Sequence, residues 1–361
     1  MQSSQSSDPW LPPRRVLLLG ISESGKSTVA KQLQILYNNG FSTEALDHHR
    51  RVVFQNIGLI LREIVEIMEE HGIEPVQKDN RDIWEWFKAE VSNQPLEPQL
   101  GPKLVIAVKS FWKDQCMEKI FSLSNDFCMP CFAPYFIEQI DRIASQDYVP
   151  TLLDILKARV KTTGLHESRF QVGLREWHVI DAGGSRSERK KWTHGFERDA
   201  SIIFVVNLAE YDSYMFEMTH RLQETLTLFE SLANLHWFTH SKIILLFTNI
   251  DLFKKKLRTI PLSDYCGDCD GGVDATKVLR YLLWRLHCLN HANCRLYPFV
   301  AEATDTPRMK TFFEAVADIL ADDSPSDNPT QLQDEIGKED SVDELISAAG
   351  RFWSGDQHWV S

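Results

Sequence analysis

Short, continuous apolar runs alternate with longer segments of helical periodicity along much of this chain. The apolar runs occupy residues 16–19, 201–208, 242–249 and 294–301, and residues 170–177 and 178–181 form a further adjacent pair. Continuous apolar runs of this length are typical of parallel strands that are covered by helices on both faces. The pattern therefore predicts a doubly wound α/β domain.

The strand pattern disappears between about residues 42 and 148. Apolar residues recur there at helical spacing, at Val53, Ile57, Ile60, Leu61, Ile64, Ile67 and Met68, and then in residues 83–91, 103–120 and 134–144. The first of these helices is expected to stop at Gly72. We expect an all-helical domain at 42–148, inserted after the first helix of an α/β domain whose two parts, 1–41 and 149–320, close around it as one sheet.

The charge of the chain is unevenly distributed. Residues 321–361 hold ten acidic and two basic side chains, a net charge of −8, which leaves −4 of the total of −12 for the rest of the chain. This mildly acidic body argues against general nucleic-acid binding. The segment 321–361 is expected to be a solvated acidic extension with one short helix near 342–349.

The composition also bears on the cellular compartment. No run reaches the ~18 apolar residues that a membrane span needs, and residues 1–14 are polar and interrupted by prolines rather than forming a secretory signal. The seven cysteines then suggest reduced thiols, and we expect a cytoplasmic protein. Gln2 stands where N-myristoylation needs glycine, which argues against membrane attachment; any association with the inner face of the plasma membrane would be peripheral.

The stretch "GISESGKST" at residues 20–28 carries the first recognisable chemistry. It fits Gly-x-x-x-x-Gly-Lys-Ser with Gly20, Gly25, Lys26 and Ser27, between a predicted strand and a predicted helix. Backbone amides of the loop and of the helix N-terminus, including those of Ser24 and Thr28, would cradle phosphates. Lys26 would neutralise β- and γ-phosphate oxygens, and the Ser27 hydroxyl would reach Mg²⁺.

With its later motifs, the chain resembles the α subunits of heterotrimeric G proteins. The motifs "GISESGKST", "ARVKTTG" (158–164), "DAGGSRSERKKW" (181–192), "FTNIDLF" (247–253) and "EATDT" (302–306) follow in that family's order. The family also carries a helical domain between the first two. The resemblance covers roughly residues 16–320 and implies a Ras-like P-loop GTPase domain with an inserted all-helical domain, binding GTP or GDP with Mg²⁺.

The resemblance assigns roles to the second and third motifs. Arg159 would be a built-in arginine finger that stabilises charge on the transferring phosphoryl group, and Glu23 would form the ion pair that positions it. Thr162 would give Mg²⁺ a second hydroxyl, and Asp181 would hold the ion through water. Three residues before the arginine would also contact the nucleotide: Leu156, Lys157 and Ala158.

The glycines after Asp181 imply a conformational switch. Gly183 and Gly184 would let the backbone approach the γ-phosphate, so that the Gly184 N–H senses whether that group is present. The family locks the active loop with a Gly–Arg–Glu contact, and Gly184, Arg189 and Glu224 match it. The switch residues therefore match the family's pattern.

The residues for hydrolysis depart from the family's pattern. Ser185 stands where the family has the glutamine that orients the attacking water, and it is too short to reach the same place without an added water. Ile21 and Ser22 replace an alanine and a glycine of the family's phosphate loop. We expect nucleotide binding with slow, impaired GTP hydrolysis.

Base recognition is also expected to be weaker than is usual in the family. The family's Asn-Lys-x-Asp becomes Thr248, Asn249, Ile250 and Asp251, so the amide and the long lysine stem that covers the ring are missing. The Asp251 carboxylate would still accept from guanine N1–H and its 2-amino group, and adenine would leave it unpaired. The Ala303 N–H would face guanine O6. From the helical domain, Asp126 is a weaker candidate for a nucleotide contact.

Two features of the sequence bear on binding of the βγ dimer: the basic segment 186–192 and the family's long N-terminal helix. Five residues are expected on a switch helix that contacts the βγ dimer or an effector: Arg186, Arg189, Lys190, Lys191 and Trp192. An exposed tryptophan beside basic residues suits an interface hot spot. The long N-terminal helix of the family is expected to be missing, so βγ binding would be weaker than usual. The acidic extension replaces the usual C-terminal tail, which leaves coupling to a seven-helix receptor and the effector open.

The cysteines raise the question of a zinc site. Cys128-x-x-Cys131 and Cys266-x-x-Cys269, with Cys288, Cys294, His287 and His291 nearby, have spacings that zinc sites use. The family uses no such site, and residues 266–272 have the composition of a variable surface loop. We therefore expect no zinc.

Two hypotheses of different classes follow. The leading one is a G-protein α subunit that hydrolyses GTP slowly, supported by the matched arginine, magnesium and switch residues. The rival is a non-hydrolysing interaction protein of the same fold, favoured by Ser22, Ser185 and Thr248. A P-loop kinase or ATPase is disfavoured by the order of the motifs and by Asp251.

Overall fold

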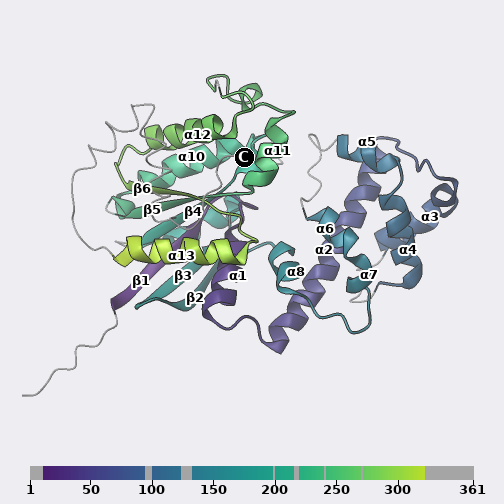
Figure 1. Ribbon diagram of the computed structural model, residues 1–361, viewed down its shortest axis with the longest axis horizontal. Helices are drawn as coiled ribbons and strands as arrows, with labels where there is room; N and C mark the ends of the chain where they lie inside the picture. The colour runs from purple at the N-terminus through teal and green to yellow at the C-terminus, as the bar shows by residue number, and fades with distance from the viewer. Residues whose placement is uncertain are drawn as a thin grey trace, which may run out of the picture. The chain divides into compact units, whose positions relative to one another are not determined.

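The computed structural model describes residues 11–93, 100–122, 132–197, 200–214, 219–239, 241–269 and 271–321 (Figure 1). These residues form two compact units. One comprises the described residues of 1–40 and 162–361, and the other comprises those of 41–161. Residues 149–161, which we expected in the α/β part, thus lie in the second unit.

The first unit contains a six-stranded sheet in the order β2-β3-β1-β4-β5-β6. The strands are β1 (Leu11–Leu19), β2 (Leu165–Val172), β3 (Arg175–Ala182), β4 (Ser201–Asn207), β5 (Lys242–Thr248) and β6 (Arg295–Val300). All neighbours are parallel except β2, which runs antiparallel to β3 at the edge. The predicted α/β class is confirmed.

The expected bounds of the antiparallel pair were wrong. The turn lies at residues 173–174, where Gly173 has φ +60°, and not between residues 177 and 178. Most of β2 is exposed, with side chains such as His166, Glu167 and Ser168 on the edge strand. A search for continuous apolar runs misses such a strand, because only one end of it is buried.

Helices cover both faces of this sheet (Figure 1). On one face, α1 (Lys26–Tyr37) and α13 (Thr306–Ala321) pack on Val16 and Leu18. On the other, α10 (Arg221–Ala233), α11 (Ile250–Leu257) and α12 (Ala275–Leu289) pack on Leu17 and Leu19. Short helical turns complete the unit: α9 (Arg186–Arg189), η1 (Trp192–Gly195), η2 (Leu208–Glu210), η3 (His236–Phe238) and η4 (Leu262–Asp264).

The second unit is helical throughout its described residues. It consists of α2 (Thr43–Glu70), α3 (Lys78–Asn93), α4 (Pro102–Trp112), α5 (Cys116–Ser122), α6 (Ala133–Glu138), α7 (Ile140–Ile143) and α8 (Leu152–Lys157). Every apolar position that predicted α2 is buried, and the helix ends before Gly72, as expected. The expected helix 103–120 breaks near Asp114, whose carboxylate accepts from the Cys116 N–H at 3.0 Å and so caps α5. The expected helix 134–144 breaks at Gln139.

The sheet topology determines where a ligand can bind in the first unit. The chain runs from β1 to β3 on one side and continues with β4, β5 and β6 on the other. In such sheets ligands bind at the carboxyl ends of the strands, where the order reverses. The loops after β1, β3, β4, β5 and β6 all start at that edge. No helix among the described residues has the length and apolar character to cross a membrane.

Candidate functional site

The predicted phosphate-binding loop, residues 20–25 (the phosphate loop), joins β1 to α1. Gly20 has φ +147°, and a Cβ there would lie 2.5 Å from the Val205 carbonyl oxygen; Gly25 has φ +103°. Both positions need glycine, because a side chain would clash or strain the backbone. The loop leads directly into a 12-residue helix whose first turn holds Ser27 and Thr28. Free N–H groups at such a helix start favour an anion.

Lys26 is a buried cation at the start of α1. Only 4% of it is exposed, and its Nζ donates to the Ile21 carbonyl oxygen at 2.6 Å and to Ser24 Oγ at 3.3 Å. Burial lowers the pKa of Lys26 to about 8. Neutral acceptors only partly offset the cost of burying this charge. An anionic phosphate in the loop would therefore be a better partner than the carbonyl and hydroxyl that Lys26 now has.

Three oxygen-bearing side chains meet beside the lysine. Ser27 Oγ lies 2.7 Å from Thr162 Oγ1 and 2.8 Å from Asp181 Oδ2. Asp181 Oδ1 is buried and has no hydrogen-bond partner among the described residues, and burial raises the pKa of Asp181. Two hydroxyls and a carboxylate with an unsatisfied oxygen are the ligand types that Mg²⁺ prefers. The residues present thus fit the expected magnesium site.

The two glycines after β3 make close contacts, Gly184 with the phosphate loop and Gly183 with Thr162. A Cβ on Gly184 would lie 2.6 Å from the Ile21 carbonyl carbon and oxygen and from Lys26 Nζ, and a Cβ on Gly183 would lie 2.8 Å from the Thr162 carbonyl oxygen. Both residues are buried. Only residues without a side chain allow these two close approaches.

Glu224 on α10 holds the segment that follows these glycines. Arg189 Nε donates to the Gly184 carbonyl oxygen at 3.1 Å, and its Nη1 donates to Glu224 Oε1 at 2.7 Å. Arg186 contributes two more bonds to Glu224, at 2.6 and 3.1 Å. The bonds from Arg186 and then Arg189 outweigh burial and hold the pKa of Glu224 below its ordinary value. The structure thus brings together the predicted residues Gly184, Arg189 and Glu224.

Trp192 corrects one expectation about the partner surface. We expected this tryptophan to be exposed, but only 3% of it is, and its indole N–H donates to the Gly183 carbonyl oxygen at 2.8 Å. Its apolar ring joins the core between the sheet and α10, α11 and α12. The charged residues beside it in the sequence gave no sign of this burial. Arg186, Lys190 and Lys191 remain exposed on the same segment.

The predicted water-positioning residue lies at the start of α9. Ser185 is half-buried, and its Oγ lies 3.2 Å from Ser187 Oγ. Its carbonyl oxygen accepts from the N–H groups of Glu188 and Arg189. Ser185 therefore anchors the short helix through its backbone.

The predicted base-recognition residues lie after β5 and β6. Thr248 is buried at the end of β5, Asn249 has φ +58°, and Asp251 is exposed in the first turn of α11. Ala303 is buried after β6, and its carbonyl oxygen accepts from Gln32 Nε2 on α1 at 2.9 Å. The sheet edge thus holds all four in the same unit as the phosphate loop.

Arg159 lies in the second unit, directly after α8, which contains Leu156 and Lys157 and ends before Ala158. Its side chain is exposed, but its backbone is clamped by Asn56 of α2. Asn56 Oδ1 accepts from the Arg159 N–H and Asn56 Nδ2 donates to the Arg159 carbonyl oxygen, both at 2.8 Å. Sequence reasoning missed Asn56, although a polar residue on the apolar face of a helix is a detectable signal.

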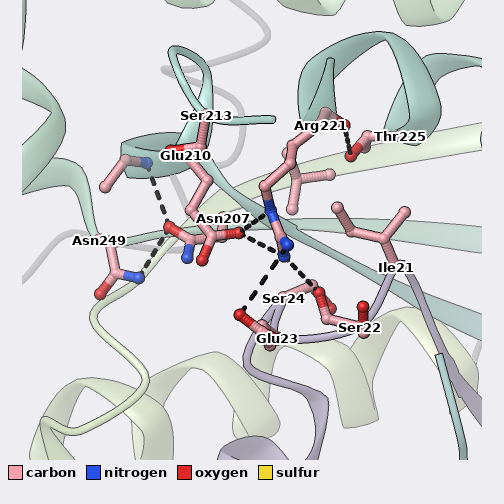
Figure 2. Close-up of polar contacts among 12 residues, drawn as sticks. Ile21, Ser22, Glu23, Ser24, Asn207, Glu210, Ser213, Arg221, Thr225 and Asn249 are labelled. Carbon is pink, nitrogen blue, oxygen red and sulfur yellow. Dashed lines mark hydrogen bonds and ion pairs between the residues drawn. The ribbon is translucent and has the colours of Figure 1, made fainter. Parts of the chain in front are cut away.

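A second missed residue is Arg221, the first residue of α10. Its Nη2 donates to the Ser22 carbonyl oxygen at 2.5 Å, and its Nε donates to Glu210 Oε2 at 2.7 Å (Figure 2). Glu23 Oε2 lies 3.8 Å from Arg221 Nη1. The expected pairing of Glu23 with Arg159 joins residues of different units and stays a prediction.

Some expected residues lie outside the described part of the chain: Asp126, Cys128, Cys131 and the extension after residue 321. Of the other predicted cysteine pair, Cys269 is buried and Cys266 is half-buried. Among the described residues no group of three or more His, Cys, Asp or Glu side chains is placed to hold a metal ion.

Fold and site together define the class: an α/β P-loop protein built to bind a nucleotide. Residues 2–320 match the family model described as G-protein alpha subunit. A guanine nucleotide-binding protein alpha-3 subunit of Neurospora crassa is 38% identical over 317 residues, covering 87% of this chain and 89% of that protein. An alpha-3 subunit of Ustilago hordei is also 38% identical, over 329 residues that cover 91% and 93%.

The chain therefore belongs to the G-protein alpha subunit family. Its Ras-like domain with an inserted helical domain, its GTP binding and its role in signal transduction follow from this membership. Members of the family are GTPases in general, typically bind Mg²⁺ with the nucleotide, and have βγ partners in general. Membership does not favour the rival of a non-hydrolysing interaction protein.

Replacing Gly184 tests the close approach of the two loops. In Gly184→Ala the methyl group would meet the Ile21 backbone, so a non-hydrolysable GTP analogue, which needs this approach, should bind about tenfold more weakly. GDP affinity should change by less than about twofold, because GDP has no γ-phosphate for the loop to contact. Titration of both nucleotides by calorimetry measures the ratio. Gly267→Ala is the control, since a Cβ there meets nothing within 4 Å; equal losses for both nucleotides would contradict this account.

Proposed function

We propose that this chain is a GTP/GDP-dependent switch that resets itself by slow hydrolysis of GTP. The observation that carries the proposal is the link from the phosphate loop to a surface segment. Gly184 lies against Ile21 and Lys26, and Arg189 joins the Gly184 carbonyl oxygen to Glu224. A γ-phosphate that contacts the Gly184 N–H would therefore stabilise residues 182–195, and its loss would release them.

Binding would rest on the backbone amides of residues 20–28 and on Lys26. The lysine would exchange its bonds with Ile21 and Ser24 for bonds with the β- and γ-phosphate oxygens. Ser27 and Thr162 would hold Mg²⁺ directly and Asp181 through water. When bound, the ion supplies neutralisation of the negative charge on the phosphate oxygens.

Hydrolysis would be an in-line attack of water on the γ-phosphorus. A bond forms between the water oxygen and phosphorus, the bond to the β-phosphate oxygen breaks, and GDP and inorganic phosphate result. Arg159 would stabilise the charge of the transition state. Ser185 is a poor positioner of the water, because its Oγ is close to Ser187 Oγ and its side chain is short. Ser22 adds a side chain where the family has none, which also favours slow turnover.

Selectivity for the base would come from Asp251, whose exposed carboxylate can accept from guanine N1–H and the 2-amino group. The Ala303 N–H would donate to guanine O6. The basic residues Arg186, Lys190 and Lys191, which are exposed beside the switch glycines, would contact a βγ dimer in the GDP state. Trp192 would contribute by anchoring residues 182–195 through its buried ring and its bond to Gly183, and not by touching the partner.

Single-turnover hydrolysis tests this proposal. The protein is loaded with labelled GTP, Mg²⁺ is added, and bound GTP and GDP are followed over time. We expect the unaltered protein to convert GTP to GDP slowly. The rate should be about 10³-fold lower in Arg159→Ala, as for loss of an arginine finger, and about tenfold higher in Ser185→Gln. Ser168→Gln, at an exposed position of the edge strand β2, is the control and should leave the rate unchanged. Bound GTP that persists in the unaltered protein would contradict self-resetting and support the rival scaffold.

The Asn56 clamp gives a prediction of its own. Asn56→Ala removes both bonds to the Arg159 backbone, so the arginine should lose its fixed position while the phosphate loop is untouched. Single-turnover hydrolysis should slow by about 10- to 100-fold at unchanged GTP affinity. Asn80→Ala is the control, because Asn80 is also buried in this unit but bonds to Asp114. A loss of rate as large in Asn80→Ala would mean that Asn56 acts only through stability.

A further inference from the structure

Asn249 has an unusual conformation and an unusual partner. It follows the last residue of β5 directly, has φ +58°, and stands at the N-cap of α11 without capping that helix. Its side-chain amide turns instead to the neighbouring strand, where Asn249 Nδ2 donates to Asn207 Oδ1 at 2.8 Å (Figure 2). An asparagine is among the few residues that adopt such a backbone readily, but it does so at some cost. The bond to Asn207 offsets that cost.

Asn207 makes a second bond that fixes its orientation. It is the last residue of β4, lies beside Thr248 in the register, and its Oδ1 accepts from the Ala209 N–H at 3.1 Å, which caps η2. A backbone N–H can only donate, so the atom facing Ala209 must be the oxygen. The atom that Asn249 presents to the same oxygen is then its Nδ2. The pair therefore has one hydrogen-bonding arrangement.

The pair attaches the start of α11 to the turn that reaches the phosphate loop. η2 ends at Glu210, which binds Arg221, and Arg221 in turn binds the Ser22 carbonyl oxygen (Figure 2). The other end of α11 is held separately, by Lys256 and the buried Asp212 at 2.8 Å. The asparagine pair is thus a contact of the start of the helix, where Asp251 lies, and not of its other end.

We infer that Asn207 is a positioning residue for recognition of the base. By holding Asn249 in its left-handed conformation, it sets the direction of the first turn of α11 and so aims the Asp251 carboxylate, two residues further on. The family has a lysine at position 249, and its stem covers one side of the base. In this chain Asn249 has no such stem and instead fixes the loop after β5 through its bond to Asn207. This inference rests on the proposed role of Asp251 in binding guanine.

The test measures GDP and inosine diphosphate affinities in the full chain with Mg²⁺. Inosine diphosphate lacks the 2-amino group, so the ratio of the two affinities reports how well Asp251 is aimed. In Asn207→Ala we expect the preference for GDP to fall by about tenfold, toward that of Asp251→Asn. Asn207→Asp should retain the preference, because both bonds of Asn207 need only an acceptor. Asn249→Ala should lose it, and the double variant Asn207→Ala with Asn249→Ala should be no worse than either single one.

Asn234→Ala is the matched control. Asn234 makes three side-chain bonds, to Glu230, Leu289 and Ala292, against two for Asn207. They do not involve the base loop, so their loss should lower stability and leave the ratio unchanged. If the ratio of GDP to inosine diphosphate affinity is unchanged in Asn207→Ala but lowered in Asp251→Asn, the inference about Asn207 is overturned and the proposed base site stands. An equal drop in Asn234→Ala would do the same. Equal binding of GDP and inosine diphosphate by the unaltered protein would overturn the proposed base site and the inference with it.

Discussion

The burial of two opposite charges at the sheet edge is the constraint on which the rest of the site depends. Lys26 and Asp181 are both nearly inaccessible, and burial works against the charged form of each, lowering the pKa of the lysine to about 8 and raising that of the aspartate. Such an arrangement is costly without a ligand. A polyanion beside the lysine and a hard cation beside the aspartate would satisfy both groups. Gly184 is needed because the two loops approach each other so closely there, and Gly20 and Gly25 are needed for their positive φ of +147° and +103°.

The contacts around the phosphate loop explain how the loss of a γ-phosphate could change a surface segment. The parallel register of β1 and β3 places Gly184 against the phosphate loop, and Glu224 on α10 holds the segment that follows. Arg221, at the start of the same helix, bonds to the Ser22 carbonyl oxygen of that loop. Residues of one helix thus contact both the loop that we propose binds phosphate and the segment that would respond to it. That shared anchor makes two discrete arrangements of residues 182–195 physically reasonable.

The sequence predicted the features that have a period or a motif. The α/β class, the helical insertion and the buried face of α2 all follow from apolar spacing. It failed where tertiary contacts decide: β2 is an exposed edge strand without an apolar run, and Trp192 is buried although its neighbours are charged. The roles of Asn56 and Asn207 depend on partners 103 and 42 residues away along the chain, and no local pattern encodes such pairs.

Hydrogen exchange over residues 182–195 would show whether this segment responds to the γ-phosphate. The full chain with Mg²⁺ would be compared in complex with GDP and with a non-hydrolysable GTP analogue, by mass spectrometry of its peptides. We expect slower exchange in 182–195 with the GTP analogue than with GDP, because a contact between the γ-phosphate and Gly184 would add to the bonds that Glu224 makes. Equal exchange with both nucleotides, at full occupancy, would contradict this expectation.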